Sequence, residues 1–191
     1  MSTRGVYGLF KNGVDKVTYN HSDSYPSGLG NDIFNFIKET SIEEMNKIFD
    51  KIILVQENDV PTIEQIINCQ EYTDLTVSNQ NITDFYCLLR KTQGNLGVYK
   101  GNLKYMIDYK DFVGNGLNCE YAYIINLDEN TLEFYIGKKN IPTNNRFTKY
   151  RDLKNNMDYP ECTLVAKIPL ERIKEGTYTI DNLENLETEE E

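Results

Sequence analysis

Apolar positions along the chain follow two patterns: short runs of β-branched and aromatic residues near both ends, and a helical spacing between them. Residues 4–10 and 14–20 are two such runs, separated by Asn12-Gly13. Asn-Gly in this setting predicts a two-residue β-hairpin, because its turn needs positive φ at both central residues. Large apolar groups fall on both faces, so we expect cover on both sides. The expected register places these residues on one face: Val6, Gly8 and Phe10 with Asp15, Val17 and Tyr19.

The middle of the chain carries helix signals. Ser41 and Glu44 have the S-x-x-E spacing of a capping box. Apolar residues then recur three and four positions apart, which predicts an amphipathic helix over 41–55. A second capping box, Thr62 with Gln65, predicts another helix. Two further helices have their expected caps at Asn31 or Asp32 and at Asn81, the last being closed by Gly94.

Strand patterns return in the second half of the chain. Residues 121–127 and 131–136 flank an Asp-Glu-Asn turn, and 163–168 form one more strand. Strands and helices are segregated along the sequence, which predicts an α+β fold with an antiparallel sheet of hairpins and helices inserted between them. An αββα layering is an open alternative. No repeat or linker divides residues 1–180, which we interpret as one domain.

Charge is distributed unevenly over the 191 residues. The net charge is −10, and the last eleven residues, 181–191, hold six Asp or Glu and no Lys or Arg. Because like-charge runs are usually disordered, we interpret this segment as an acidic, flexible tail. Direct nucleic-acid binding depends on Lys and Arg neutralising phosphates, so it is not expected here. An acidic surface suits a basic partner protein instead.

The sequence holds no motif for a metal or nucleotide site. The four cysteines, Cys69, Cys87, Cys119 and Cys162, are at least 18 residues apart, and His21 is the single histidine. Zinc sites need closely spaced ligands and no Walker loop occurs, so we expect no metal or cofactor. The cysteines are better explained as reduced core residues. Without a signal peptide or an apolar run of about 20 residues, we expect a cytoplasmic protein with no membrane contact.

The loop 21–30 is the leading candidate site. It places Asp23 and Tyr25 beside a Pro-Ser-Gly-Leu-Gly turn, just before a predicted helix N-terminus. Free N–H groups at such a terminus attract anions, so the loop is suited to gripping a carboxylate, a phosphate or a substrate carbonyl. The alternative is a plain connection, in which the glycines supply positive φ and Asp23 bonds backbone donors.

The N-terminus is a second candidate site. If Met1 is removed, Ser2 becomes the first residue and Thr3 the next. A terminal hydroxyl can act as a nucleophile with its own α-amine, of pKa about 8, as general base. The order hairpin, helices, hairpin loosely resembles the layering of N-terminal nucleophile hydrolases, and the residues then expected around the site are Arg4, Tyr19 and Asp23. An ordinary small-residue start is the alternative, and fold analogy does not decide between them.

Three carboxylates accompany the second predicted hairpin. Glu120 and Asp128 bracket its first strand and Glu133 lies opposite, an arrangement suited to acid–base chemistry or to a divalent ion. Asp128 is better explained as a turn residue. Glu120 precedes a nearly all-apolar strand, so we expect a structural pair with Arg4 or Arg90. The aromatic residues of this hairpin have acidic neighbours, and we expect a core or protein-contact role for them: Tyr121, Tyr123, Phe134 and Tyr135.

Several phrases of the sequence occur together in one family. They are Thr3-Arg4-Gly5 with Gly8 and the Asn-Gly hairpin, Tyr19-Asn20-His21 with Asp23-Ser24-Tyr25-Pro26-Ser27-Gly28-Leu29-Gly30, Phe85-Tyr86-Cys87-Leu88-Leu89-Arg90 with Gln93-Gly94, and Cys119-Glu120-Tyr121-Ala122-Tyr123-Ile124-Ile125-Asn126-Leu127-Asp128. Over most of residues 3–136 the chain resembles a family of uncharacterised proteins found in phages, prophages and some microbial genomes. The resemblance implies a phage or prophage origin, and hence a host-cell location. It implies no activity.

Three functions stay open. The first is a phage accessory protein that binds and modulates a host protein, such as a defence nuclease, through tyrosine-rich and acidic surfaces. The second is an amide hydrolase of the N-terminal nucleophile kind, with catalytic candidates Ser2, Thr3 and Asp23. The third is a small-molecule or nucleotide-binding protein. The binding candidates are Arg4, Tyr19, His21, Asp23, Tyr25 and Glu120. Nothing in the sequence indicates the oligomeric state.

Overall fold

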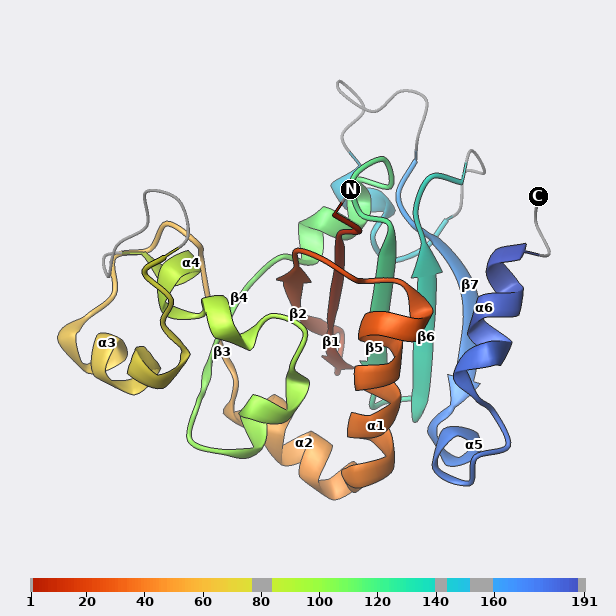
Figure 1. The fold of residues 1–191 in the computed structure, drawn as a ribbon, viewed down its shortest axis with the longest axis horizontal. Helices are drawn as coiled ribbons and strands as arrows, with labels where there is room; N and C mark the ends of the chain where they lie inside the picture. The colour runs from red at the N-terminus through yellow and green to blue at the C-terminus, as the bar shows by residue number, and fades with distance from the viewer. Residues whose placement is uncertain (1, 77–83, 140–143, 152–159, 189–191) are drawn as a thin grey trace.

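A five-stranded sheet forms the centre of the molecule (Figure 1). The computed structural model describes residues 2–76, 84–139, 144–151 and 160–188. Strand order in the sheet is β2-β1-β5-β6-β7. The strands are β1 (Gly5–Lys11), β2 (Val14–Asn20), β5 (Tyr121–Asn126), β6 (Thr131–Ile136) and β7 (Thr163–Pro169). Neighbouring strands are antiparallel except β1 and β5, which are parallel. The two hairpins therefore share one continuous sheet, and the predicted α+β class is confirmed.

The first hairpin has the predicted turn and register. Asn12 and Gly13 have φ values of 52° and 76°, the positive pair that a tight two-residue turn requires. Phe10 pairs with Asp15 and Gly8 with Val17. The Asp128 carboxylate accepts the Asn12 backbone N–H at 2.8 and 3.0 Å. Asp128 thus joins the turns of the two hairpins, so its role is structural.

Helices cover one face of the sheet. They are α1 (Asn31–Glu39), α2 (Ile42–Lys51), α5 (Leu170–Lys174) and α6 (Ile180–Thr188). Their apolar residues pack with Tyr7, Leu9, Tyr123 and Ile125 of the sheet in the larger core. Figure 1 shows α1 lying over β5. Helical spacing predicted the start of α2 correctly, because the Ser41 hydroxyl accepts the Glu44 backbone N–H as an N-cap.

The end of α2 lies earlier than the predicted residue 55. Ile52 leaves the helix in an extended conformation, and Ile53–Val55 form β3. This strand pairs in parallel with β4 (Tyr105–Ile107). The apolar residues at 52–55 are compatible with both the helical and the strand period. They form a strand because they pair with β4, about fifty residues away. That distant partner is invisible to local periodicity.

The second face of the sheet is covered by short helices and loops. Its smaller core includes Val17, Ala122, Ile124 and Phe147. Short 3-10 helices at Lys110–Gly114 and Thr148–Tyr150 belong to this side. The β3–β4 pair adjoins the free edge of β2, where the Tyr109 N–H bonds the Val17 carbonyl at 2.9 Å. Among the described residues the layers are therefore helices, one sheet and short 3-10 helices, not the αββα alternative.

A lobe built on α3 (Ile63–Cys69) and α4 (Phe85–Leu88) projects beside the sheet (Figure 1). Thr62 and Gln65 form the predicted capping box in both directions. Asp84 caps α4 through the Cys87 N–H. The predicted cap at Asn81 lies outside the described residues. Short helical turns complete the chain at Pro26–Gly30, Gln70–Tyr72, Arg90–Thr92 and Leu96–Lys100.

The C-terminal segment differs from the expected flexible tail. Residues 181–188 belong to α6, and the Leu183 side chain is fully buried. α6 packs against residues 26–30. The charge count alone indicated disorder, whereas Leu183, with Ile180 and Leu186 partly buried beside it, packs the helix on the core. In the described part of the chain, no helix has the length and apolarity needed to cross a membrane.

Candidate functional site

A pocket of about 690 Å³ opens beside the loop that the sequence marks as the leading candidate. Three segments line it: residues 20–29 after β2, the exposed side of α1, and residues 93–100. Its volume falls within the range of about 300–1,000 Å³ typical of ligand sites. The pocket is therefore the candidate functional site of the molecule.

Backbone contacts hold the first rim of the pocket. Asp23 has a φ of 55°, and its carbonyl accepts the Leu29 N–H at 2.8 Å. A Cβ at Gly28 would lie 2.2 Å from that same carbonyl oxygen, so only glycine fits there. The Asn20 amide donates to the Ser24 hydroxyl at 2.9 Å. The loop is thus both a chain connection and a shaped wall.

The pocket lining is acidic. It contains three carboxylates, Asp23, Asp32 and Glu39, and one ammonium group, Lys100. Burial raises the pKa of Asp32. The Lys100 ammonium lies 5.5 Å from the centre of the Phe36 ring. The sequence predicted an anion at this helix N-terminus, but the carboxylates beside it repel anions, so the electrostatics favour a cation or a hydrogen-bond donor.

Side-chain amides supply the remaining polarity of the pocket. Asn35, Gln93 and Asn95 line it together with the carboxylates. An amide offers both donors and an acceptor, so these groups suit a guanidinium, an ammonium or a peptide group. The described residues contain no cluster of three His, Cys, Asp or Glu side chains arranged to hold a metal ion.

Arg4, Tyr19 and His21 meet at one end of the sheet, next to the pocket. The Tyr19 hydroxyl lies 3.1 Å from His21 Nδ1, and its ring contacts Tyr109 with centroids 5.3 Å apart. Burial raises the pKa of Tyr19, and the nearby Arg4 guanidinium partly offsets this. The His21 backbone N–H donates to Gln93 Oε1 at 3.2 Å. Gln93, which lines the pocket, thus links this cluster to it.

The N-terminal hydroxyls lie at the same end of the sheet. Ser2 is exposed, and its hydroxyl donates to the His21 carbonyl. The Thr3 carbonyl accepts the Ser24 N–H at 3.2 Å. Met1 lies outside the described residues, so the base expected for a terminal nucleophile has no described position. Neither Ser2 nor Thr3 lines the pocket.

Glu120 has a partner other than the predicted arginines. Its carboxylate pairs with Lys138 Nζ at 2.6 Å, while Arg4 Nη2 donates to Asn118 Oδ1 at 2.7 Å. Arg90 lies over the Tyr86 ring. The prediction of an Arg4 or Arg90 partner is therefore wrong. Lys138, just after β6, pairs with the Glu120 carboxylate instead. The two residues are 18 positions apart in the sequence, and no local pattern predicts this pair.

The six binding candidates thus divide between two places. Asp23 lines the pocket, whereas none of Arg4, Tyr19, His21, Tyr25 and Glu120 does. Tyr25 follows Asp23 and is 39% exposed. The pocket residues missed by sequence reasoning were Asp32, Glu39 and Lys100. Asp32 and Glu39 had a signal in the sequence, because both lie on the exposed polar side of α1, away from the core. Lys100 had none, because it comes from the distant segment 93–100.

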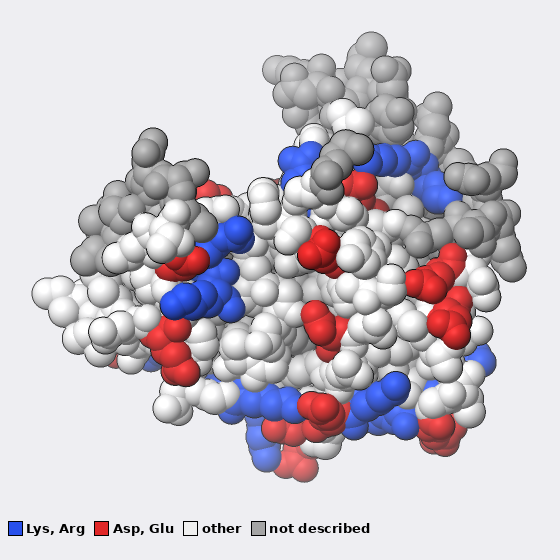
Figure 2. All heavy atoms as spheres, in the orientation of Figure 1, with Lys and Arg blue, Asp and Glu red and all other residues white. Residues whose placement is uncertain are grey.

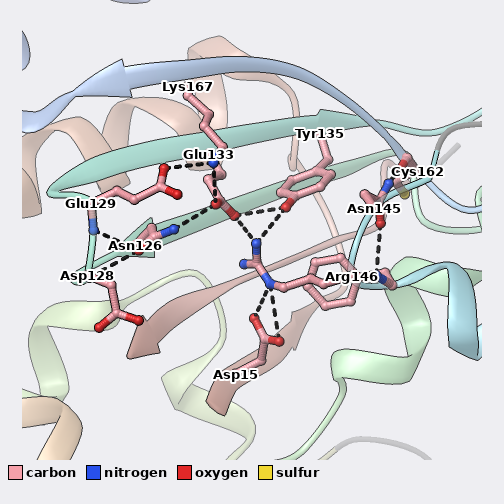
Figure 3. Close-up of polar contacts among 11 residues, drawn as sticks. Asp15, Asn126, Asp128, Glu129, Glu133, Tyr135, Asn145, Arg146, Cys162 and Lys167 are labelled. Atoms are coloured by element: carbon pink, nitrogen blue, oxygen red, sulfur yellow. Dashed lines mark hydrogen bonds and ion pairs between the residues drawn. The ribbon is translucent and has the colours of Figure 1, made fainter. Parts of the chain in front are cut away.

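A second polar cluster surrounds Arg146 on the other face of the sheet (Figure 3). Arg146 Nε donates to Asp15 Oδ1 at 2.9 Å, and Nη1 donates to the Glu133 carboxylate and to the Tyr135 hydroxyl. The Tyr135 hydroxyl donates to Glu133 Oε2 at 2.8 Å, and Asn126 donates to Glu133 Oε1 at 2.9 Å. The Arg146 side chain is 24% exposed and that of Glu133 is 1% exposed.

The Arg146 cluster has the contacts of a structural clamp. Its guanidinium also stacks against Phe10 and Phe147, with 4.3 and 4.8 Å to the ring centres. Burial is the largest influence on Asp15 and raises its pKa, and Arg146 opposes that rise. One half-buried cation thus joins β2, β6 and the 144–151 segment. Sequence reasoning noted Glu133 but missed Arg146. A buried carboxylate predicts a cationic partner, but the sequence does not indicate which Lys or Arg it is.

The cysteines and sheet tyrosines are core residues. All four cysteines are free and buried. Burial raises the pKa of Cys119, which makes its thiol a poor nucleophile. Tyr123 and Tyr135 have no exposed surface. The expected core role is therefore confirmed for Tyr123, Phe134 and Tyr135, whose rings are covered by the protein itself, whereas Tyr121 is half-buried.

No family model, curated protein or solved structure matches this chain.

Proposed function

We propose that the protein is a non-catalytic binding protein whose pocket receives a basic group of a partner. The observation that carries the proposal is the charge of the pocket, three carboxylates against one ammonium group in about 690 Å³. The net charge of −10 supports the same kind of partner, because it speeds encounter with a basic surface.

Within this class we propose a phage or prophage accessory protein that modulates a host protein. The sequence phrases described above support the phage origin. Nucleases and other nucleic-acid-binding proteins present Lys and Arg on their working surfaces, so an acidic binder can compete with nucleic acid there. A host defence nuclease is therefore the partner that this proposal favours.

Affinity capture from host lysate tests the proposal. Immobilised protein is expected to retain one host protein stoichiometrically, and Asp32→Asn/Glu39→Gln is expected to reduce its recovery about tenfold, since two of three pocket carboxylates are lost. Glu171→Gln, an exposed acid on α5, is the matched control and should leave recovery unchanged. Repeated capture with no stoichiometric host protein would contradict the proposal.

A small cationic metabolite is a second candidate ligand, favoured by the pocket volume. Thermal unfolding across a panel of spermidine, arginine, ATP and other metabolites tests it. A ligand that binds the folded state raises the melting temperature with concentration. Stabilisation by spermidine or arginine that Asp32→Asn/Glu39→Gln abolishes would favour this candidate. Stabilisation by ATP alone would contradict a cation site.

A further inference from the structure

The lobe carries an exposed apolar surface on α3. Ile63 and Ile67 are 78% and 64% exposed, and Val60, just before the helix, is 83% exposed. Ile63 and Ile67 are four residues apart, so their side chains are neighbours on one face of the helix. Single exposed apolar residues are ordinary, but adjacent isoleucines with this exposure form a continuous patch. We call Val60, Ile63 and Ile67 the α3 surface.

The packing of α3 keeps this surface on the solvent side of the helix. The opposite side of α3 is inside, where Cys69 is fully buried and Ile66 packs against the larger core. The capping box of Thr62 and Gln65 fixes where the helix begins, and hence which face is exposed. Turning Ile63 and Ile67 inward would therefore expose Cys69 and Ile66. The apolar face cannot be hidden by a simple rotation of the helix.

The surroundings of the α3 surface are acidic. From Ile52 to Leu89 the sequence holds six Asp or Glu and no Lys or Arg. Glu64 and Glu71 are exposed on the lobe itself. Figure 2 shows the projecting tip over α3 as uncharged in this view, with both acidic and basic side chains beside it. The basic residues that flank this stretch are Lys51 before it and Arg90 and Lys91 after it, and the last two lie by Asp74.

We propose that the α3 surface docks a basic amphipathic segment of a partner protein, its apolar side on Ile63 and Ile67 and its Lys or Arg residues beside Glu64 and Glu71. Helix-on-apolar-face recognition uses anchors at this spacing. Charge decides among the occupants. A second copy would bring like charges together, and an anionic membrane would meet the same repulsion. The inference deepens the proposed function, on which its biological meaning rests, but it uses a different surface.

A designed peptide tests the α3 surface without knowledge of the natural partner. The probe is an amidated helix of about 18 residues with leucine along one face and lysine elsewhere, long enough to be helical when bound. Ile63→Ser/Ile67→Ser is expected to weaken its binding about tenfold or more, measured by fluorescence anisotropy. Glu64→Gln/Glu71→Gln is expected to weaken binding about threefold and to reduce its dependence on salt.

Matched controls separate this surface from general attraction of basic peptides. Val14→Ser removes an apolar residue that is 45% exposed at the first hairpin, and Glu171→Gln removes an exposed acid on α5. Both should leave peptide affinity unchanged. An equal loss in Val14→Ser, no loss in the Ile63/Ile67 variant, or equal binding of a peptide with glutamate in place of lysine would overturn the proposal.

Two further measurements distinguish the other occupants and the pocket. A dimer in sedimentation velocity that Ile63→Ser/Ile67→Ser dissociates would assign the surface to a second copy. Binding to phosphatidylserine vesicles that the same variant abolishes would assign it to a membrane. Either result overturns the proposal. The pocket variant Asp32→Asn/Glu39→Gln should bind the peptide normally, so failure of the pocket proposal and failure of this one give different results.

Discussion

Arg146 is the cation that joins two buried carboxylates on the second face of the sheet. It lies between Asp15 and Glu133, and these carboxylates are only 9% and 1% exposed. A buried carboxylate is tolerated only while it is paired, because burial removes the water that would otherwise solvate its charge. The energetic importance of Arg146 therefore comes less from the pair itself than from what its removal would leave behind.

Arg146→Met is expected to destabilise the protein by about 3–5 kcal/mol, because the buried Glu133 would lose its closest cation and keep only Lys167, whose ammonium lies 3.8 Å away. Urea unfolding followed by circular dichroism measures the change. Lys47→Met is the control, since Lys47 pairs with Glu43 in the open at 2.7 Å, and an exposed pair contributes little to stability. Adding Glu133→Gln to Arg146→Met should recover part of the loss. An Arg146→Met loss no larger than that of Lys47→Met would contradict the clamp.

Asp32 gives a pH dependence whose sign follows from its surroundings. Burial raises the pKa of Asp32 in the folded state, so the folded protein holds this proton more tightly than the unfolded chain does. The resulting stabilisation is present below the ordinary carboxyl pKa of about 3.9 and is lost as pH rises through the raised pKa. Asp32→Asn should therefore gain stability relative to the natural protein between about pH 3 and pH 6. A constant difference over that range would contradict it.

At the scale of elements, short-range chemistry decides where α2 begins. Ser41→Ala removes the acceptor for the Glu44 N–H and is expected to cost about 1 kcal/mol, measured by urea unfolding. Ser41→Asp keeps an acceptor at the same position and should stay close to the natural stability. If both variants lose equally, the hydroxyl matters for a reason other than capping.

The elements that sequence predicts well are those with a local cause. The Asn12-Gly13 turn, the caps at Ser41 and Thr62 and the strands of the second hairpin all follow from neighbours a few residues away. β3 does not, because Ile53 has its strand partner at Tyr105. The parallel pairing of β1 with β5 is equally long-range, and no turn signal announces it.

The candidate pocket was predictable in part for the same reason. Asp23 lies in a loop whose composition attracts attention, so sequence reasoning named it. Lys100 and Gln93 reach the pocket from a distant segment, and only the folded chain brings them there. The predicted anion preference rested on the helix N-terminus alone and did not weigh the acid within it, which opposes an anion. Asp32 lies in the first turn of α1.

At the scale of the whole molecule, α6 closes the helical layer from the C-terminal side. Leu183→Ala is expected to cost about 2–5 kcal/mol, because it removes a fully buried side chain and leaves a cavity. Leu186→Ala, on the same helix but only partly buried, should cost less. Thermal and urea unfolding measure both. Equal, small losses would mean that α6 contributes little to the fold.

The place of β1 inside the sheet has a consequence for synthesis on the ribosome. β2 follows β1 directly in the chain and pairs with one edge of β1. The other edge of β1 pairs with β5, beginning at Gly5 and Tyr121, so it stays unpaired until β5 has been synthesised. Until then a nascent chain carries a hairpin with an open, apolar backbone edge, the kind of surface that recruits chaperones or aggregates. Strand pairing between segments this far apart in the sequence is slow. The yield of folded protein should therefore depend on how well the unpaired edge of β1 is protected during translation.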